Sequence, residues 1–322
     1  MKAIHLRGAL GAGLAVLMLA TAACGGGEDE SEVPMRTVTD ATGTEVEVPV
    51  EPQRVVTLHY AATQPVLDLG MTLVGQGIFE DGILPEDIEA EVEAVPVVAS
   101  GQSEPEFEQI AELDPDLILA PNIYEDDVLE QLQAITSVYT FTLRGGDRAG
   151  WPQRTEEVAD ALNLSDRVEE LSEEFAARQA QIAEEYADVI EGTTVAVIGA
   201  YEENNFYAWG ETNMTGTLLM PLGFTWSAQE NAIVEGQDEP EATVSNEKIV
   251  TAVGDADLLL LDSNLRGETN AFMDSLQETP LYQELPAVQD GHVYASGKNT
   301  VAGYTDANYT LDMVEAALQD MR

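Results

Sequence analysis

Residues 165–191, in the middle of the chain, carry a helical pattern that no proline or glycine interrupts. The apolar residues recur at steps of three, four and seven, which places them on one face of an α-helix: Val168, Leu171, Phe175, Ile182, Tyr186, Val189 and Ile190. Asn163 and Ser165 are candidate N-caps, and Gly192 is a candidate C-terminal stop. A helix of about 27 residues would be roughly 40 Å long, because each residue adds about 1.5 Å. This length predicts a rigid connector between two separate parts of the chain.

The polar face of this helix carries eight carboxylates between Asp166 and Asp188 but only two arginines. Such a face is typical of a helix that meets solvent on one side. The apolar stripe on its other side is then free to pack against the parts of the chain that flank it.

Strand and helix patterns alternate before and after the connector, with short connections that imply mainly parallel sheets. A β-hairpin over residues 37–48 precedes short buried strands near residues 55–58, 73–76, 95–98, 117–119 and 138–141. A loop through Phe79 and Pro85 is predicted before the strand near 95–98. After the connector the sequence predicts a strand at 194–198, an aromatic-rich loop at 201–209, a polar loop at 225–240, a strand at 257–261 and a C-terminal helix at 306–321. We therefore predict an α/β protein of two lobes, each with a central mainly parallel sheet, joined by one long α-helix. The expected boundaries are 36–162, 163–192 and 193–322.

The amino terminus resembles a secretory signal peptide, with Lys2 and Arg7 before an apolar run over residues 9–20. This run is too short to span a bilayer as a helix. Cys24, the only cysteine, follows two alanines and precedes three glycines and an acidic stretch. We expect residues 1–24 to be a lipoprotein signal with Cys24 as the lipid-bearing residue, and residues 25–35 to be a flexible tether. A plain signal peptide is the alternative, because Thr21 replaces the usual leucine.

The chain is strongly acidic, with 60 Asp and Glu residues against 13 Lys and Arg residues and a formal net charge of −47. Such a surface repels nucleic acid and anionic lipid headgroups. The acids are spread along the chain, so we interpret them as a solvated surface suited to a saline or alkaline medium, and not as a motif.

The sequence contains none of the common catalytic motifs: no GxSxG, no phosphate-binding GxxxxGK[ST] and no HExxH. Beyond the signal peptide only His59 and His292 remain, and no cysteine follows Cys24, so a zinc-type site of nitrogen and sulfur ligands cannot be built. We expect no enzyme activity, no metal site and no resident cofactor.

Four stretches in order carry a resemblance to a known family: RTVTDATGTEVEVPVEPQRVV, EPEFEQIAELDPDLILAP, the central helix, and PLYQELPAVQDGHVY followed by SGKNTVAGYTDANYTLDMVEAAL. Together they resemble the substrate-binding proteins of bacterial ABC importers for iron-siderophores, haem and cobalamin, the class III periplasmic binding proteins. The resemblance covers nearly the whole mature chain. It implies two lobes facing each other across a cleft, little hinge motion, and delivery of ligand to a permease and its ATPase. It also implies a monomer outside the cytoplasm, held at the membrane by its lipid.

In this family a glutamate near the start of one helix in each lobe docks onto arginine pockets of the permease. The matching positions are Glu108 in PEFEQI and Glu247 in VSNEKI. Two ordinary solvated carboxylates, favoured by the helix dipole, are the alternative.

The ligand of such a fold contacts loops at the carboxyl ends of strands. The residues expected there are Phe79, Tyr124, Arg144, Tyr201, Phe206, Tyr207, Trp209, Trp226, Arg266, Lys298 and Tyr304. Aromatic surface with few cations suits a transiently bound ferric siderophore of the hydroxamate or mixed type better than a highly anionic catecholate chelate. Cobalamin or haem, the latter with His59 and Tyr60 as candidate axial ligands, is the alternative ligand. A surface co-receptor or sensor lipoprotein is the alternative of another class.

Overall fold

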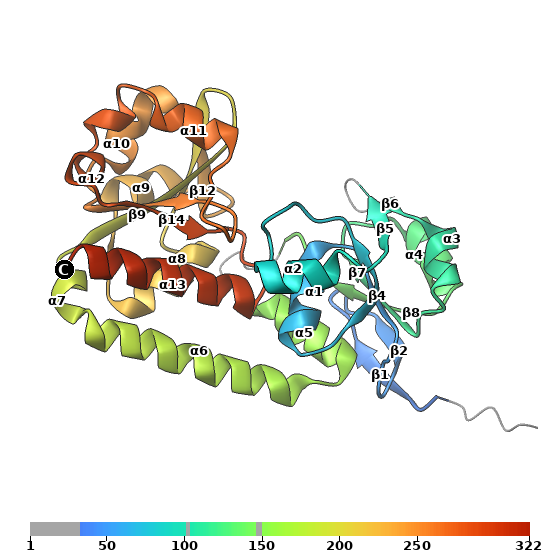
Figure 1. Ribbon diagram of the computed structural model, residues 1–322. Helices are drawn as coiled ribbons and strands as arrows, with labels where there is room; N and C mark the ends of the chain where they lie inside the picture. The colour runs from blue at the N-terminus through green and yellow to red at the C-terminus, as the bar shows by residue number, and fades with distance from the viewer. Residues whose placement is uncertain (1–32, 101–103, 146–149) are drawn as a thin grey trace, which may run out of the picture. The chain divides into compact units, whose positions relative to one another are not determined.

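A computed structural model describes residues 33–100, 104–145 and 150–322, in which two six-stranded sheets are flanked by helices (Figure 1). The first sheet has the strand order β6-β5-β4-β3-β7-β8. Its strands are β3 Val55–Thr57, β4 Leu73–Gly77, β5 Val97–Ser100, β6 Glu104–Pro105, β7 Leu117–Pro121 and β8 Ser137–Phe141. Every neighbouring pair is parallel except β5 and β6. The carboxyl ends of its five parallel strands therefore lie at one edge.

The second sheet has the order β12-β10-β9-β13-β14, and β11 also pairs with β9. Its strands are β9 Thr194–Glu202, β10 Asn205–Trp209, β11 Thr225–Trp226, β12 Glu241–Ser245, β13 Leu258–Asp262 and β14 Val293–Gly297. Strands β9, β11, β13 and β14 run parallel, whereas β10 is antiparallel to both β9 and β12. The predicted α/β class with two mainly parallel sheets is confirmed.

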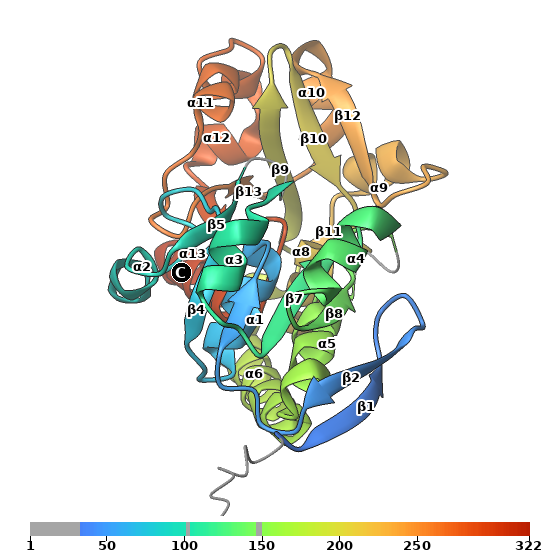
Figure 2. The same cartoon turned by 90° about the vertical axis from the view of Figure 1, so that its right-hand side faces the viewer.

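Helices surround both sheets, as Figures 1 and 2 show. Those before the connector are α1 Tyr60–Asp68, α2 Glu86–Val92, α3 Phe107–Glu112, α4 Asp126–Gln133 and α5 Pro152–Leu162. Those after it are α8 Met214–Leu219, α9 Ala228–Val234, α10 Ile249–Val253, α11 Ala271–Gln277, α12 Pro286–Asp290 and α13 Tyr304–Asp320. The predicted hairpin is also present, as β1 Met35–Thr39 and β2 Glu45–Pro49. In the described part of the chain, no helix has the length and apolarity needed to cross a bilayer.

The connector is α6 Ser165–Glu185, a helix of 21 residues along the lower edge of Figure 1. It is shorter than predicted, because the backbone leaves the helical conformation at Tyr186 and resumes only in α7 Ala187–Ile190. Tyr186 is buried, and its hydroxyl accepts a hydrogen bond from Gln319 near the end of α13. Val168 joins the core of the first sheet and Phe175 that of the second, so the apolar face packs on both parts as expected.

The residues at the start of the connector act differently from the prediction. Asn163 does not cap α6 but ends α5 in a left-handed conformation with φ of 60°. Leu164 precedes the first turn of α6 and supplies no side-chain cap. Asn is one of the few residues that tolerate a left-handed backbone, which explains its use at this junction.

The sequence-based prediction was wrong in three segments. The aromatic-rich segment at 201–209 is not a loop but a hairpin of β9 and β10, with Asn204 at φ of 64° in the turn. The polar segment 225–240 contains β11 and α9, and the presumed loop before residue 95 contains α2. Because these elements are short, contacts with the sheets or with neighbouring loops stabilise them more than the periodicity of their own residues does.

Candidate functional site

A cavity of about 760 Å³ lies between the carboxyl ends of the two sheets. Residues that end or follow parallel strands line it from both sides: Leu58 and His59 after β3, Ile78 after β4, Tyr201 in β9, Asp262 at the end of β13 and Lys298 after β14. Ligands of open α/β sheets bind at such strand ends. The volume also falls in the range of small-molecule pockets, about 300–1,000 Å³.

His59 caps α1 with its side chain, because its Nδ1 accepts the backbone N–H of Ala61 at 3.1 Å. Burial, together with the positive charges of Arg154, Lys298 and Arg144, lowers the pKa of His59 to about 4. The imidazole is therefore neutral near pH 7, with its proton on Nε2. His59 thus offers one N–H donor and no charge.

The opposite wall carries a tyrosine and a carboxylate. Tyr201 is 45% exposed as a residue, and its hydroxyl donates a hydrogen bond to Asp262. Asp262 also accepts the backbone N–H of Asn299 at 2.8 Å. Loss of solvation raises the pKa of Asp262 to about 6, although both hydrogen bonds and nearby Lys298 oppose the rise. The ring centroids of Tyr201 and Tyr207 lie 5.3 Å apart, so a second aromatic ring supports the first.

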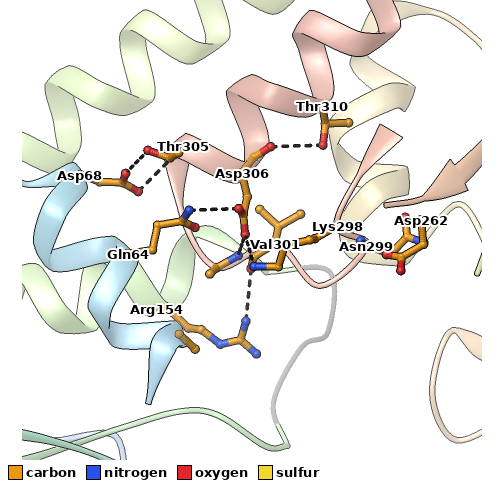
Figure 3. Close-up of polar contacts among 12 residues, drawn as sticks. Gln64, Asp68, Arg154, Asp262, Lys298, Asn299, Val301, Thr305, Asp306 and Thr310 are labelled. Carbon is orange, nitrogen blue, oxygen red and sulfur yellow. Dashed lines mark hydrogen bonds and ion pairs between the residues drawn. The ribbon is translucent and has the colours of Figure 1, made fainter. Parts of the chain in front are cut away.

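Lys298 lines the cavity, but its charge is compensated inside the protein (Figure 3). Its Nζ lies 3.1 Å from the Asp306 carboxylate, which is fully buried, and 4.6 Å from the centroid of the Tyr60 ring. Burial would lower the pKa of Lys298, but the Asp306 carboxylate together with Tyr60 and Asp262 outweighs it, and the pKa is raised. Lys298 is therefore a charged donor at neutral pH.

Carboxylates outnumber cations in the described lining of the cavity. Glu80, Asp81, Asp262 and Glu268 face one amine, that of Lys298. A ligand with several negative charges would meet repulsion here, whereas a neutral or cationic one would not. In the described residues no group of three or more His, Cys, Asp or Glu side chains is arranged to hold a metal ion.

Three of the predicted ligand-binding residues, Phe79, Tyr201 and Lys298, line the cavity. Tyr207 is half-buried behind Tyr201 and stacks on Trp209, with ring centroids 6.2 Å apart. Tyr207 therefore supports the wall but is not among its lining residues.

Four other predicted aromatics belong to the hydrophobic cores and not to the cavity. Phe206 is 0% exposed, and Trp209, Trp226 and Tyr304 are also buried. Phe206 and Trp209 are strand residues of β10, and Trp226 Nε1 donates to the carbonyl of Trp209 at 3.1 Å. Tyr304 makes edge contacts with Trp151 and Phe175. The structure places these four side chains away from the cavity, because the segments read as loops are packed sheet and helix.

Three further candidates also lie outside the cavity lining. Arg144 is exposed, and its backbone is fixed by the side chain of Asn122. Tyr124 is half-buried against the core of the first sheet. Arg266 directs its guanidinium to the carboxylate of Glu89, so its charge is already engaged by the protein.

The predicted docking glutamates are both exposed. Glu108 lies in the first turn of α3, and Glu247 lies in the 3₁₀ turn η2 Asn246–Lys248, where its backbone N–H bonds to the Ser245 hydroxyl. Cys24 lies outside the described residues.

Sequence reasoning missed the acidic and amide part of the wall. Asp262 ends the buried run LLLLD, and Asn264 and Asn270 follow it. The rule that cavities form at strand ends applies to Asp262 directly, so this signal was available. Glu80 and Asp81 gave no such signal, because acidic pairs are common in this chain.

Comparison with known proteins finds a matching family, similar sequences and similar solved structures. Residues 55–300 match the periplasmic binding protein family. The chain is 26% identical to the "Probable siderophore-binding lipoprotein YfiY" of Bacillus subtilis over 313 residues, 94% of each chain. It is 27% identical to the Fe(3+)-citrate-binding protein YfmC of the same organism, covering 86% of this chain and 82% of the relative. The siderophore periplasmic binding protein from the fuscachelin gene cluster of Thermobifida fusca superposes with a TM-score of 0.73 at 27% identity, over 85% of this chain and 98% of that one.

Proposed function

This chain belongs to the periplasmic binding protein family, and we propose that it captures a ferric siderophore between its sheets and delivers it to the permease of an ABC importer. The similarity to proteins named for siderophore and ferric citrate binding supports this class of ligand. Membership of a binding-protein family also confirms that the chain is not an enzyme.

The observation that carries the choice of ligand is the chemistry of the cavity wall. Aromatic rings of Tyr60, Phe79 and Tyr201 offer apolar surface for a chelate, and Lys298 offers a donor. The four carboxylates disfavour anionic ferric citrate and catecholate complexes. Ferric hydroxamates carry little or positive charge, so a hydroxamate or mixed ligand fits best.

Binding of a ligand panel tests this proposal. Quenching of tryptophan fluorescence should show the tightest binding for a ferric trihydroxamate or a mixed chelate, compared with ferric citrate, a ferric tris-catecholate, haem and cobalamin. Tyr201→Ala should lower the affinity about 5- to 30-fold, the effect of losing about 1–2 kcal/mol of aromatic contact. Tyr201→Phe keeps the ring and should lose less, and Tyr294→Ala, which removes a tyrosine bonded to Asp320 away from the cavity, should bind normally.

Haem is the second candidate, because neutral His59 and adjacent Tyr60 both line the cavity. Tight binding of haem, lost in His59→Ala but kept in Tyr201→Ala, would replace the siderophore proposal. A protein that binds none of the six ligands would contradict both.

We further propose that Glu108 and Glu247 dock the protein on its permease and that Cys24 carries a lipid anchor. Both glutamates are exposed, one beside each sheet, and can form salt bridges with a basic partner. Glu108→Ala and Glu247→Ala should leave ligand affinity unchanged and reduce uptake of labelled iron chelate by cells, with the double variant reduced further. Glu112→Ala, at the other end of α3, is the matched control. Normal uptake in the double variant would favour a co-receptor or sensor that does not load the permease.

A further inference from the structure

Two loops from opposite sheets meet beside the cavity. The first, residues 78–85, follows β4, leads into α2 and lines the cavity with Phe79, Glu80 and Asp81. The second, residues 263–270, follows β13 and lines it with Asn264 and Glu268. Figure 1 shows α2 at the junction of the two halves, next to the start of α13. Contacts between these loops therefore join two walls of the cavity.

One carboxylate bridges the two loops. One oxygen of Glu89, in α2, pairs with the guanidinium of Arg266, while the other accepts the backbone N–H of Gly82 at 2.7 Å. The Glu89 side chain is 4% exposed and that of Arg266 is 37% exposed. The pair is thus anchored on the α2 side and open to solvent on the other.

The backbones of the two loops also touch. Leu265 N donates to the carbonyl of Gly82 at 2.7 Å. Gly82 has a φ of +78°, and a Cβ placed there would lie 2.6 Å from the Asn264 amide. The Asn264 side chain in turn accepts the backbone N–H groups of Arg266 and Glu268. Only glycine permits so close an approach of the loops.

We propose that Glu89 and Arg266 form an ionic clasp between the two cavity walls and that this clasp controls how fast a bound ligand leaves. The proposal rests on the cavity being the ligand site. Arg266 then acts as a positioning residue through the loop 263–270 and not as a ligand contact. The Arg266 side of the clasp, 37% exposed, can open to solvent without disturbing the cores, whereas in the Lys298–Asp306 pair the lysine side chain is only 13% exposed and the carboxylate is fully buried.

Stopped-flow dissociation of the ferric chelate that binds best in the panel tests the clasp. Arg266→Gln and Glu89→Gln should each raise the dissociation rate about two- to fivefold, the effect expected for an ion pair with one solvent-exposed partner, with the association rate little changed. High salt should speed dissociation from the wild type but not from these variants. Arg266→Lys keeps a positive charge and should therefore release the ligand more slowly than Arg266→Gln does. Arg167→Gln breaks the exposed pair with Glu170 on α6 and is the matched control.

Hydrogen exchange at the Leu265 amide gives a measurement that needs no ligand. This amide should exchange faster in both clasp variants than in the wild type, because its acceptor lies on the opposite loop. Unchanged exchange together with unchanged dissociation would overturn the proposal. If Arg266→Gln weakens binding but Glu89→Gln strengthens it, Arg266 contacts the ligand directly and the clasp is wrong. If no ligand of the panel binds, the proposed function fails, while the Leu265 amide still decides whether the clasp exists.

Discussion

Replacing Asp306 by alanine is expected to lower the free energy of unfolding by about 3–5 kcal/mol, the usual cost of breaking a buried ion pair. The Asp306 carboxylate is fully buried and accepts three hydrogen bonds, from Lys298 Nζ at 3.1 Å, the backbone of Ala302 at 2.8 Å and Gln64 Nε2 at 3.0 Å (Figure 3). Its loss leaves a largely buried ammonium and two donors without this acceptor. Because Gln64 lies in α1 and Asp306 in α13, a contact between the two halves is lost as well.

Urea unfolding measures this loss of stability, and two further variants are compared with Asp306→Ala to identify its cause. Asp312→Ala, on the same helix, removes a carboxylate that is 56% exposed in its pair with Arg178, and should cost no more than about 1 kcal/mol. Adding Lys298→Met to Asp306→Ala should recover part of the stability, since the uncompensated charge is removed. Equal small losses for Asp306→Ala and Asp312→Ala would contradict this account.

The second large effect expected is a gain in stability on acidification. Loss of solvation raises the pKa of both Asp68 and Asp262 to about 6, from 3.8 when solvated, against the hydrogen bonds that each accepts. A raised folded-state pKa means that the group stabilises the fold when protonated, below pH about 4, and that this contribution is lost as pH rises through 6. The free energy of unfolding should therefore fall between pH 4 and pH 7 by up to about 3 kcal/mol per group.

Urea unfolding at a series of pH values, compared among variants, tests this direction. The other carboxylates of this acidic chain also lose mutual repulsion when protonated, so the wild-type slope alone is ambiguous. Asp68→Asn and Asp262→Asn should each flatten the slope between pH 4 and pH 7, and Asp312→Asn should not. Slopes equal to the wild type in both variants would show that these two carboxylates titrate normally when folded.

Sequence patterns predicted those helices and strands that are determined mainly by their own residues. Long periodic segments such as α6 and α13, and apolar runs such as β7 and β13, lie close to their expected positions. The end of the connector was misplaced, because Tyr186 continues the apolar stripe but leaves the helix to pack beneath α13. An apolar stripe in the sequence indicates which residues are buried. It does not indicate whether the backbone stays helical between them.

The aromatic segment shows how packing between distant residues misled the prediction. Gly199 lies just before the segment that was predicted to be a loop, and a Cβ there would lie 2.3 Å from the ring of Trp209. The glycine thus makes room for a core tryptophan ten residues later, and Phe206 and Trp209 turn inward from β10. Arg266 is a similar case: the sequence analysis placed it among the ligand-binding residues, but its partner is Glu89, 177 positions away.

The sharing of α6 between the two cores also bears on how the protein unfolds. Leu171 packs against the cores of both sheets, between Val168 on one side and Phe175 on the other. Unfolding of either half would remove apolar contacts from α6 and expose the core of the other half. We therefore expect the two halves to unfold together, with the cavity between them lost only when the whole fold is lost.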